Sequence, residues 1–202
     1  MSDEIAPRAG GPAAVTRLTR FGPLIEEFIP RMSVTEWIEA TTDAQPADQD
    51  KRRNVTAGVL VHRLFQSRRR PGSDTTVELA FARTLLRPDE CPEIGDIDAI
   101  VQEGVSIWRT LSERKDVSTL LASGRVMHEV PFSLQARRDN KPVILRGVID
   151  CVVEREDGSV VIVEFKTGRP RSWHARQLDL YVEAATAVFP EARVDGRLIY
   201  AD

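Results

Sequence analysis

The sequence predicts an α/β (α+β) fold in which a mixed sheet carries helices on its faces. Three observations indicate this class. Apolar residues recur at helical spacing from about residue 55 to 124, and β-branched residues then form three extended runs that end at Lys166. A strongly periodic helix and a last extended run follow. Such a strand–helix–strand crossover adds a final strand to the three-stranded antiparallel meander that precedes it.

Size and composition are those of one ordinary globular domain with an appendage. The chain has 202 residues, of which 42% are hydrophobic and 29% are charged. This composition can bury a core and excludes disordered and fibrous classes. The chain is too short for a multi-domain motor, and it contains no GxxxxGK[ST] phosphate loop, so the sequence indicates no ATP site.

Charge, cysteines and hydropathy narrow the possible functions. The formal net charge is −3, so a nucleic-acid partner would have to be held by a local basic patch. The two cysteines, Cys91 and Cys151, cannot supply a four-thiolate zinc or iron–sulfur site. There is neither an apolar run of about 18 to 20 residues nor a signal peptide, so we expect no membrane association and a cytoplasmic location.

The chain is expected to divide near residue 55. Glycines and prolines are frequent in residues 1–32, and residues 41–54 are polar. Between these segments, Ser33 and Glu36 form a capping box that predicts a short helix up to about Ala40. The expected organisation is an N-terminal arm, short helix and linker at 1–54, a helical part at 55–124 and a sheet core at 125–202.

Each remaining element has its own local signal. Thr56 and Ser172 are the predicted N-caps of two helices, and proline or glycine follows several predicted helix ends. Period-2 runs of β-branched residues between turn residues predict the strands. The predicted helices cover 57–68, 75–87, 96–113, 116–123 and 173–189, and the predicted strands cover 126–137, 143–154, 160–166 and 193–200.

Three ionisable residues interrupt predicted strands that are otherwise apolar. Asp150 lies in the second strand of the meander, and Glu164 and Lys166 lie in the third. Charged groups in buried strands are costly unless they are paired or bound to a metal. Alternation places Glu164 and Lys166 on one face, and whether Asp150 joins them depends on the register of the hairpin.

The length of the hairpin loop decides that register. If residues 156–158 form a three-residue loop with Gly158 in the left-handed conformation, Asp150 lies opposite Glu164, with Cβ atoms about 4.5–5.5 Å apart. A two-residue loop would instead pair Asp150 with Phe165 and place the two carboxylates on opposite faces. A shared site therefore requires the longer loop.

Two carboxylates at that separation favour a divalent cation between them. They would otherwise repel each other, and oxygen ligands with open positions suit Mg²⁺ or Mn²⁺. Lys166 could orient or deprotonate a water molecule and counter charge on a phosphoryl group. The residues thus indicate metal-assisted phosphodiester hydrolysis. The alternative is a surface salt bridge of Asp150 or Glu164 with Lys166, which would carry no chemistry.

Spaced motifs then resemble a known family. Asp150, the segment Glu164-Phe165-Lys166 and the later Gln177 and Tyr181 resemble the PD-(D/E)XK nuclease superfamily, in particular the RecB/AddA-type nuclease domain of helicase-nucleases. The resemblance covers about residues 55–200 and implies a restriction-endonuclease-like core. Because only two cysteines are present, the chain resembles the branch without an iron–sulfur cluster.

The resemblance implies roles at the metal. Asp150, Glu164 and the carbonyl of Phe165 would ligate the ion, and Lys166 would be the catalytic lysine. The segment around His62 resembles the upstream histidine motif of the family, which implies a further metal ligand or a phosphate contact. The segment around Glu129 resembles a Glu-x-Pro-Phe strand, which implies a supporting or second-metal carboxylate. As alternatives, His62 is an ordinary half-buried histidine and Glu129 an edge-strand charge.

The resemblance also implies DNA contacts beside the metal. Gln177 and Tyr181, spaced i, i+4, share one helix face and would contact DNA or brace the site. Alternatively, Tyr181 belongs to the core and Gln177 is solvated. Apart from the resemblance, the basic residues Arg169, Arg171 and Arg176, together with Arg137-Arg138, could line a groove for phosphates if the first helix packs near the meander. Alternatively, each is a solvated loop charge.

The function implied is a Mg²⁺- or Mn²⁺-dependent DNA exonuclease domain. It would be the C-terminal part of an ATP-dependent helicase-nuclease acting on single strands or ends during double-strand-break repair and recombination. Helicase domains or a helicase-nuclease partner subunit would deliver the DNA, and the chain would be either an excised domain or a free-standing relative. The alternative is a catalytically silent module of the same fold that binds DNA or a partner protein.

Overall fold

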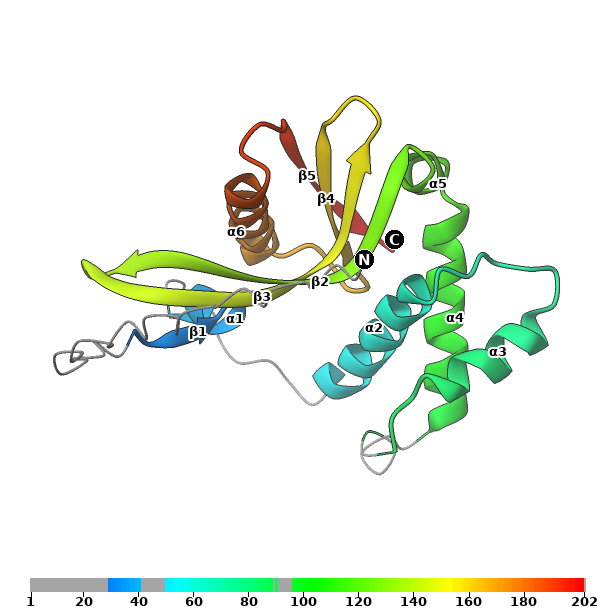
Figure 1. Ribbon diagram of the computed structural model, residues 1–202. Coiled ribbons are helices and arrows are strands. Elements are labelled where there is room, and N and C mark those ends of the chain that lie inside the picture. Colours follow the sequence, from blue (N-terminus) through cyan, green and yellow to red (C-terminus); the bar gives the residue numbers. More distant parts are fainter. Residues whose placement is uncertain (1–28, 41–49, 89, 91–95, 202) are drawn as a thin grey trace, which may run out of the picture.

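A five-stranded mixed sheet lies at the centre of the computed structural model (Figure 1). The structure describes residues 29–40, 50–88, 90 and 96–201. The α/β class with an antiparallel meander, a helix crossover and a parallel last strand is confirmed. The strands are β1 (Arg31–Ser33), β2 (Gly124–Arg138), β3 (Lys141–Arg155), β4 (Val160–Lys166) and β5 (Val194–Tyr200). The helices are α1 (Val34–Glu39), α2 (Asp50–Gln66), α3 (Thr75–Thr84), α4 (Ile97–Glu113), α5 (Lys115–Leu121) and α6 (Ser172–Val188).

The long strand β3 organises the sheet. β2 pairs with it along its whole length, in antiparallel register from Gly124–Arg155 to Arg138–Lys141. On the other edge, β1 pairs in parallel with residues 144–146, and β4 pairs antiparallel with residues 151–154. The β2–β3 hairpin therefore has an outer half beside β1 and an inner half beside β4 and β5, and it extends well beyond the rest of the sheet (Figure 1).

Helices cover the two faces of the sheet separately. On one face, α2, α4 and α5 bury a core that includes Leu60, Trp108 and Phe165. On the other face, α1 and α6 pack over a second core that includes Ile149 and Ile162. Burial of apolar side chains in these two layers stabilises the fold and fixes α2 and α6 on opposite sides of β4.

The β2–β3 hairpin changes face at Glu129 and Asp150. His128 stacks on Phe65 of α2, whereas Val130, only two residues further on, packs in the α6 layer. Residues two apart in a strand normally share a face. The ladder has no pair between His128–Cys151 and Val130–Ile149, and Glu129 has a φ of 51°, in the left-handed region. The two halves of the hairpin therefore present opposite sets of side chains to α6.

Several predicted boundaries were wrong. The second helix begins at Asp50, so Thr56 lies within α2 and is not its N-cap. The N-cap of α6 is Arg171, whose N–H donates to His174 Nδ1, and Ser172 is already helical. The capping box of Ser33 and Glu36 is confirmed, whereas the strand β1 just before it was not predicted.

Two further expectations concern the N-terminal arm and the membrane. Most of the predicted arm and linker, at residues 1–28 and 41–49, lies outside the described residues, so the division near residue 55 stays a prediction. Among the helices that the structure describes, none combines the length and the hydropathy needed to cross a bilayer.

Candidate active site

The site lies where β3 and β4 separate. The predicted three-residue loop is confirmed, because Arg155 N–H donates to Ser159 O at 2.9 Å and Gly158 has a φ of 79°. The register runs as predicted as far as the Cys151–Val163 pair. Asp150 and Glu164, expected to be the next pair, instead lie at the fork where the ladder ends.

Asp150 satisfies the backbone at this fork. Its Oδ2 accepts a hydrogen bond of 2.9 Å from the N–H of Phe165, a donor on the facing strand just beyond the last ladder pair. Its Oδ1 lies 3.2 Å from Nδ1 of His62, which comes from α2. The carboxylate thus links β3 to β4 and to α2 at the point where the ladder ends.

Three potential metal ligands converge here from three elements. Nδ1 of His62 is 3.5 Å from Oε1 of Glu129, and the ligand atoms of His62, Glu129 and Asp150 all lie within 4.8 Å of one another. Glu129 reaches this position from the left-handed turn of β2. A non-glycine residue in this conformation is strained, and such strain often marks a functional site.

His62 supplies the positive charge in this cluster. Burial disfavours the charged ring, but hydrogen bonds and charge from Asp150 and Glu129 outweigh it and raise the pKa of His62 to about 10. The imidazolium therefore acts as the counter-ion of the two carboxylates, in the place where a divalent cation would supply positive charge.

Glu164 is the most deeply buried acid at the fork. Only 2% of its surface is exposed, and its Oε1 pairs with Nζ of Lys166 at 2.7 Å. Burial and the charge of Asp150 raise the pKa of Glu164 to about 8, although Lys166 opposes the shift. Its Oε2 is buried and has no hydrogen-bond partner among the described residues.

Lys166 belongs to a short polar chain that ends on α6. Besides Glu164, its Nζ donates to Oε1 of Gln177 at 2.7 Å. The amide nitrogen of Gln177 donates in turn to the hydroxyl of Tyr181 at 2.9 Å. Burial raises the pKa of the Tyr181 phenol, so this hydroxyl stays protonated. Since Tyr181 accepts from the amide nitrogen, the amide oxygen of Gln177 faces Lys166.

This donor set fits a divalent cation. Two carboxylates, a third carboxylate with an unpartnered buried oxygen and one imidazole are the oxygen and nitrogen ligands that Mg²⁺ or Mn²⁺ accepts. A cation would satisfy Oε2 of Glu164 and relieve the repulsion between Glu164 and Asp150. The thiol of Cys151 takes no part, because it is buried in the core on the α2 side of the sheet.

The structure places the other expected site residues differently. Arg169, Arg171 and Arg176 are exposed near the start of α6, outside the group of side chains that converges at the fork. The side chain of Phe165 stacks on Phe65 at 4.3 Å, so only its backbone faces the site. The roles expected of these residues stay predictions.

Two contacts at the site were not predicted from the sequence. The ring of Trp173 lies 5.4 Å from Nζ of Lys166, and Gly58 of α2 approaches Thr167 so closely that a Cβ there would be 3.2 Å from the threonine hydroxyl. The small residue lets α2 pass beneath the end of β4 and so brings His62 to the fork. Such a contact between distant segments leaves no local pattern.

Comparisons with known proteins found a matching family and several relatives. The model of the PD-(D/E)XK nuclease superfamily matches residues 37–202. Three curated relatives are each named as a subunit of an ATP-dependent helicase/nuclease. The protein from Anoxybacillus flavithermus is 36% identical over 88 residues, which are 38% of this chain and 7% of that protein. The protein from Bacillus velezensis is 27% identical over 153 residues, covering 63% of this chain and 11% of its own length. The protein from Heliobacterium modesticaldum is 28% identical over 187 residues, covering 80% of this chain and 13% of its own length. The chain therefore spans no more than 13% of the length of these three relatives.

Proposed function

The chain belongs to the PD-(D/E)XK nuclease superfamily, and from this premise we propose that it is a metal-dependent DNA nuclease that hydrolyses phosphodiester bonds. One observation carries the proposal. His62, Glu129 and Asp150 converge at the β3–β4 fork, beside the buried Glu164 and its lysine partner. A purely structural role is a weak explanation, because it would leave a buried carboxylate oxygen unpartnered.

Asp150, Glu164 and His62 are proposed to hold the cation, together with the carbonyl of Phe165. Glu129 would support this site or bind a second ion. When bound, the cation polarises the scissile phosphate and lowers the pKa of the attacking water. For His62 to serve as a ligand it must first give up its proton, since only the neutral ring has a free lone pair on Nδ1.

Lys166 is proposed to act on the substrate directly. Its ammonium group has three donors, and Glu164 and Gln177 accept from two of them. The third donor remains for the attacking water or a phosphate oxygen, where it would orient the nucleophile and counter developing negative charge. Tyr181 supports this role by fixing the Gln177 amide.

The finer assignment rests on the resemblance to RecB/AddA-type domains and on the names of the relatives. We propose an exonuclease that uses Mg²⁺ or Mn²⁺ and acts on single-stranded DNA or DNA ends, as the C-terminal nuclease domain of an ATP-dependent helicase-nuclease. Helicase domains or a partner subunit would deliver the strand during double-strand-break repair and recombination. A cytoplasmic location is proposed on the same ground.

The test compares end-labelled linear with circular single-stranded DNA, each incubated with Mg²⁺, with Mn²⁺ and with chelator. We expect cleavage with either metal and none with chelator, and an exonuclease degrades only the linear strand. DNA binding without cleavage under every condition would instead identify a silent binding module and would overturn the proposal. Cleavage of the circle would keep the nuclease but overturn the exonuclease assignment.

A further inference from the structure

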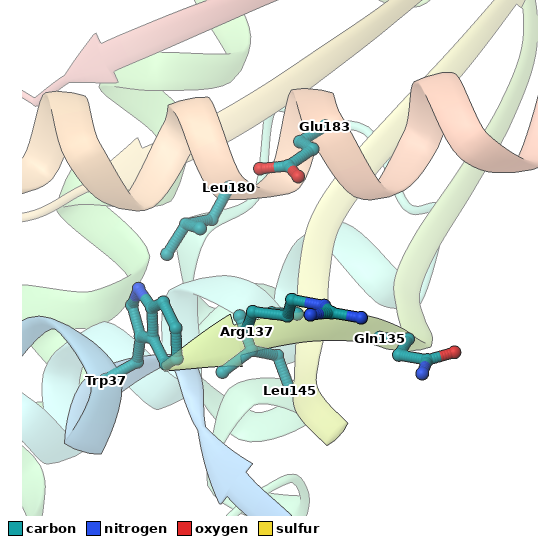
Figure 2. Close-up of a pocket in the computed structure, with 7 residues that line it drawn as sticks. Trp37, Gln135, Arg137, Leu145, Leu180 and Glu183 are labelled. Carbon is teal, nitrogen blue, oxygen red and sulfur yellow. The ribbon is translucent and has the colours of Figure 1, made fainter. Parts of the chain in front are cut away.

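An open cavity lies in the α6 layer, beside the outer half of the β2–β3 hairpin. Its volume is about 440 Å³, and it opens to solvent between α1, α6 and β2. Figure 2 shows Leu180 directed from α6 toward Trp37 of α1, Glu183 lying against α6, and the guanidinium of Arg137 lying along β2. The lining residues are Trp37, Gln135, Ala136, Arg137, Leu145, Leu180 and Glu183.

The cavity is positioned by the change of face in the hairpin. Beyond Glu129, the side chains of β2 and β3 that face α6 are those of opposite parity, and Leu145 becomes fully buried beneath α6 and α1. The outer half of the hairpin consequently forms a floor that continues from the catalytic fork. The helix α1 contributes no residue to the metal cluster, yet its Trp37 forms one wall of this cavity.

The outer half of the hairpin, which contributes Arg137 to the cavity, is basic although the chain as a whole is acidic. The hairpin segment from residue 131 to 148 contains four basic residues and one acidic residue, a net charge of +3, whereas the whole chain has −3. The basic residues are Arg137, Arg138, Lys141 and Arg146. A local cationic strip of this kind favours a polyanion over a neutral or basic partner.

The cavity and the catalytic lysine lie along one helix. Gln177, which binds Lys166, precedes Glu183 by six residues of α6, or about 9 Å at about 1.5 Å per residue. A nucleic-acid strand covers that distance in about two or three nucleotides at a rise of about 3.4 Å each. A strand with its scissile phosphate at the fork could therefore place a nearby nucleotide in the cavity.

We propose that this cavity binds one nucleotide of a single-stranded DNA substrate, two or three positions from the bond that is cut. The base stacks on the indole of Trp37, Glu183 bonds its polar edge, and Arg137 binds a neighbouring phosphate. The inference rests on the proposed function and adds to it the place where the DNA strand binds. It also provides selection for single strands, because a paired base cannot enter a cavity between two helices.

The mixture of groups favours a nucleotide over other occupants. An inorganic anion would meet the carboxylate of Glu183 as well as Arg137, and a purely apolar peptide would make no use of the exposed polar side chains of Arg137, Gln135 and Glu183. A nucleobase offers a π-face for stacking and an edge with both donors and acceptors, and its phosphate suits a guanidinium. Aromatic stacking combined with a basic strip is how many proteins hold single strands.

The test measures binding of a fluorescent single-stranded oligonucleotide by anisotropy, with metal chelated so that no cleavage occurs. Trp37→Leu keeps an apolar side chain but removes the stacking surface, and we expect it to weaken binding about 5- to 100-fold. Trp37→Phe keeps a ring and should stay within about threefold of wild type. Thermal unfolding of each variant establishes that it folds.

A second variant does not depend on the helix α1. Arg137 is exposed, so Arg137→Ala should fold normally, weaken binding and reduce the salt dependence by about one phosphate contact. Arg83→Ala on α3 is the matched control, because it removes the same charge from an exposed site on the other layer. Equal effects of the two variants would mean that only overall charge matters and would overturn the proposal.

The position of the base is tested with a single abasic nucleotide moved along the strand. In wild type, one position two or three nucleotides from the mapped cut should lose affinity, and in Trp37→Leu the same position should have no further effect. If wild type binds and cuts DNA but Trp37→Leu has the same affinity and abasic profile, the inference fails and the proposed function stands. If wild type neither binds nor cuts DNA, both fail.

Discussion

The ammonium group of Lys166 is held by partners on two sides of the sheet edge. Glu164 anchors it from β4 itself, and Gln177 anchors it from α6, each at 2.7 Å. A lysine side chain that is held in this way loses its rotamer freedom on folding instead of during the reaction, which favours its use at a defined point near the cluster. This arrangement supports the catalytic role proposed for Lys166 over a structural one.

Replacement of Lys166 tests this role. Lys166→Ala should lower the cleavage rate by at least about a thousandfold, because it removes a charge that acts on the substrate, while the fold persists. Single-turnover cleavage and thermal unfolding are the measurements. Lys115→Ala, at an exposed lysine at the start of α5, is the control and should cleave like wild type. Normal cleavage by Lys166→Ala would remove the mechanism.

Asp150 has two separable functions, one in the backbone and one in the proposed metal site. Asp150→Asn keeps an oxygen that can accept from Phe165 N–H but removes the charge, whereas Asp150→Ala also leaves that donor unpaired. Both variants should lose cleavage. In the absence of metal, Asp150→Ala should be about 1–3 kcal/mol less stable than Asp150→Asn, because both variants lose the charge beside His62 and only Asp150→Ala also leaves Phe165 N–H unpaired.

Metal binding supplies the direct measurement for Asp150. Mg²⁺ or Mn²⁺ should raise the unfolding temperature of wild type in proportion to saturation and should have little effect on Asp150→Asn. Calorimetric titration gives the same comparison independently. A variant that is stabilised by metal as strongly as wild type would exclude Asp150 as a ligand.

At the scale of elements, α6 approaches β5 closely at Gly196. A Cβ on Gly196 of β5 would lie 2.8 Å from Val182 Cγ2 and 2.9 Å from Leu178 Cγ. The position of α6 decides where Gln177 and Tyr181 lie, and thus where Lys166 is held. Packing of one helix on one strand therefore controls the geometry around Lys166 from a distance.

Gly196→Ala tests this coupling. The added methyl group should push α6 away from β5, destabilise the fold by about 1–3 kcal/mol and lower the cleavage rate. Urea unfolding and single-turnover cleavage measure the two effects. Gly168→Ala is the matched control, because a Cβ there meets nothing within 4 Å, and its stability should stay near wild type. Unchanged stability of Gly196→Ala would mean that α6 can shift freely.

An ion pair between Arg63 and Glu90 anchors α2, the helix that carries His62. The guanidinium of Arg63 makes two bonds to Glu90, at 2.7 and 2.6 Å, and also donates to Leu85 O at 2.8 Å. The hydrogen bonds from Arg63 lower the pKa of Glu90 from 4.5 to about 2. Bidentate geometry of this kind is stronger than that of an ordinary surface pair.

This ion pair predicts that the free energy of unfolding depends on pH. Because the folded pKa of Glu90 is lowered, its contribution is complete above about pH 5 and is lost as the pH falls from 4.5 toward 2. Glu90→Gln should be less stable than wild type by about 1 kcal/mol at pH 7, and the difference should shrink at pH 3. Urea unfolding at both pH values measures it. Asp98→Asn, which breaks the exposed pair with Arg83, should cost little, and an equal effect of both variants would contradict this account.

At the scale of the whole molecule, the short segment β1–α1 packs on the same sheet as the rest of the described chain. β1 adds a parallel strand to the outer half of β3, and Val34 and Ile38 of α1 are each only 4% exposed in the α6 layer. The superfamily model also begins at residue 37, within α1. This segment therefore completes one face of the sheet as well as the cavity that contains Trp37.

A pair of truncations tests that conclusion. A protein of residues 41–202 should be less stable than one of residues 29–202 by about 3 kcal/mol, because the shorter chain loses the burial of Val34 and Ile38. Thermal unfolding of the two proteins gives the comparison. Equal midpoints would show that β1 and α1 contribute nothing to the fold and that the domain begins later, as the sequence predicts.

Much of the fold and half of the site follow from local patterns. The loop of Glu156, Asp157 and Gly158 determines the β3–β4 register, because a glycine with positive φ closes a three-residue turn. Alternation then places Glu164 and Lys166 on one face. The beginning of α2 could not be predicted in this way, because a polar, charged stretch such as residues 50–54 becomes helical only as part of a longer helix that packs on the sheet.

By itself, the sequence determined the order of the elements, the meander and the pair formed by Glu164 and Lys166, since each depends on periodicity or turn chemistry within a few residues. Only the tertiary structure decided that His62 meets Asp150, that Glu129 turns out of its strand and that Trp37 lies above the outer hairpin. These contacts join segments up to about a hundred residues apart. Their geometry depends on how helices pack against a twisted sheet, and no local pattern encodes that packing.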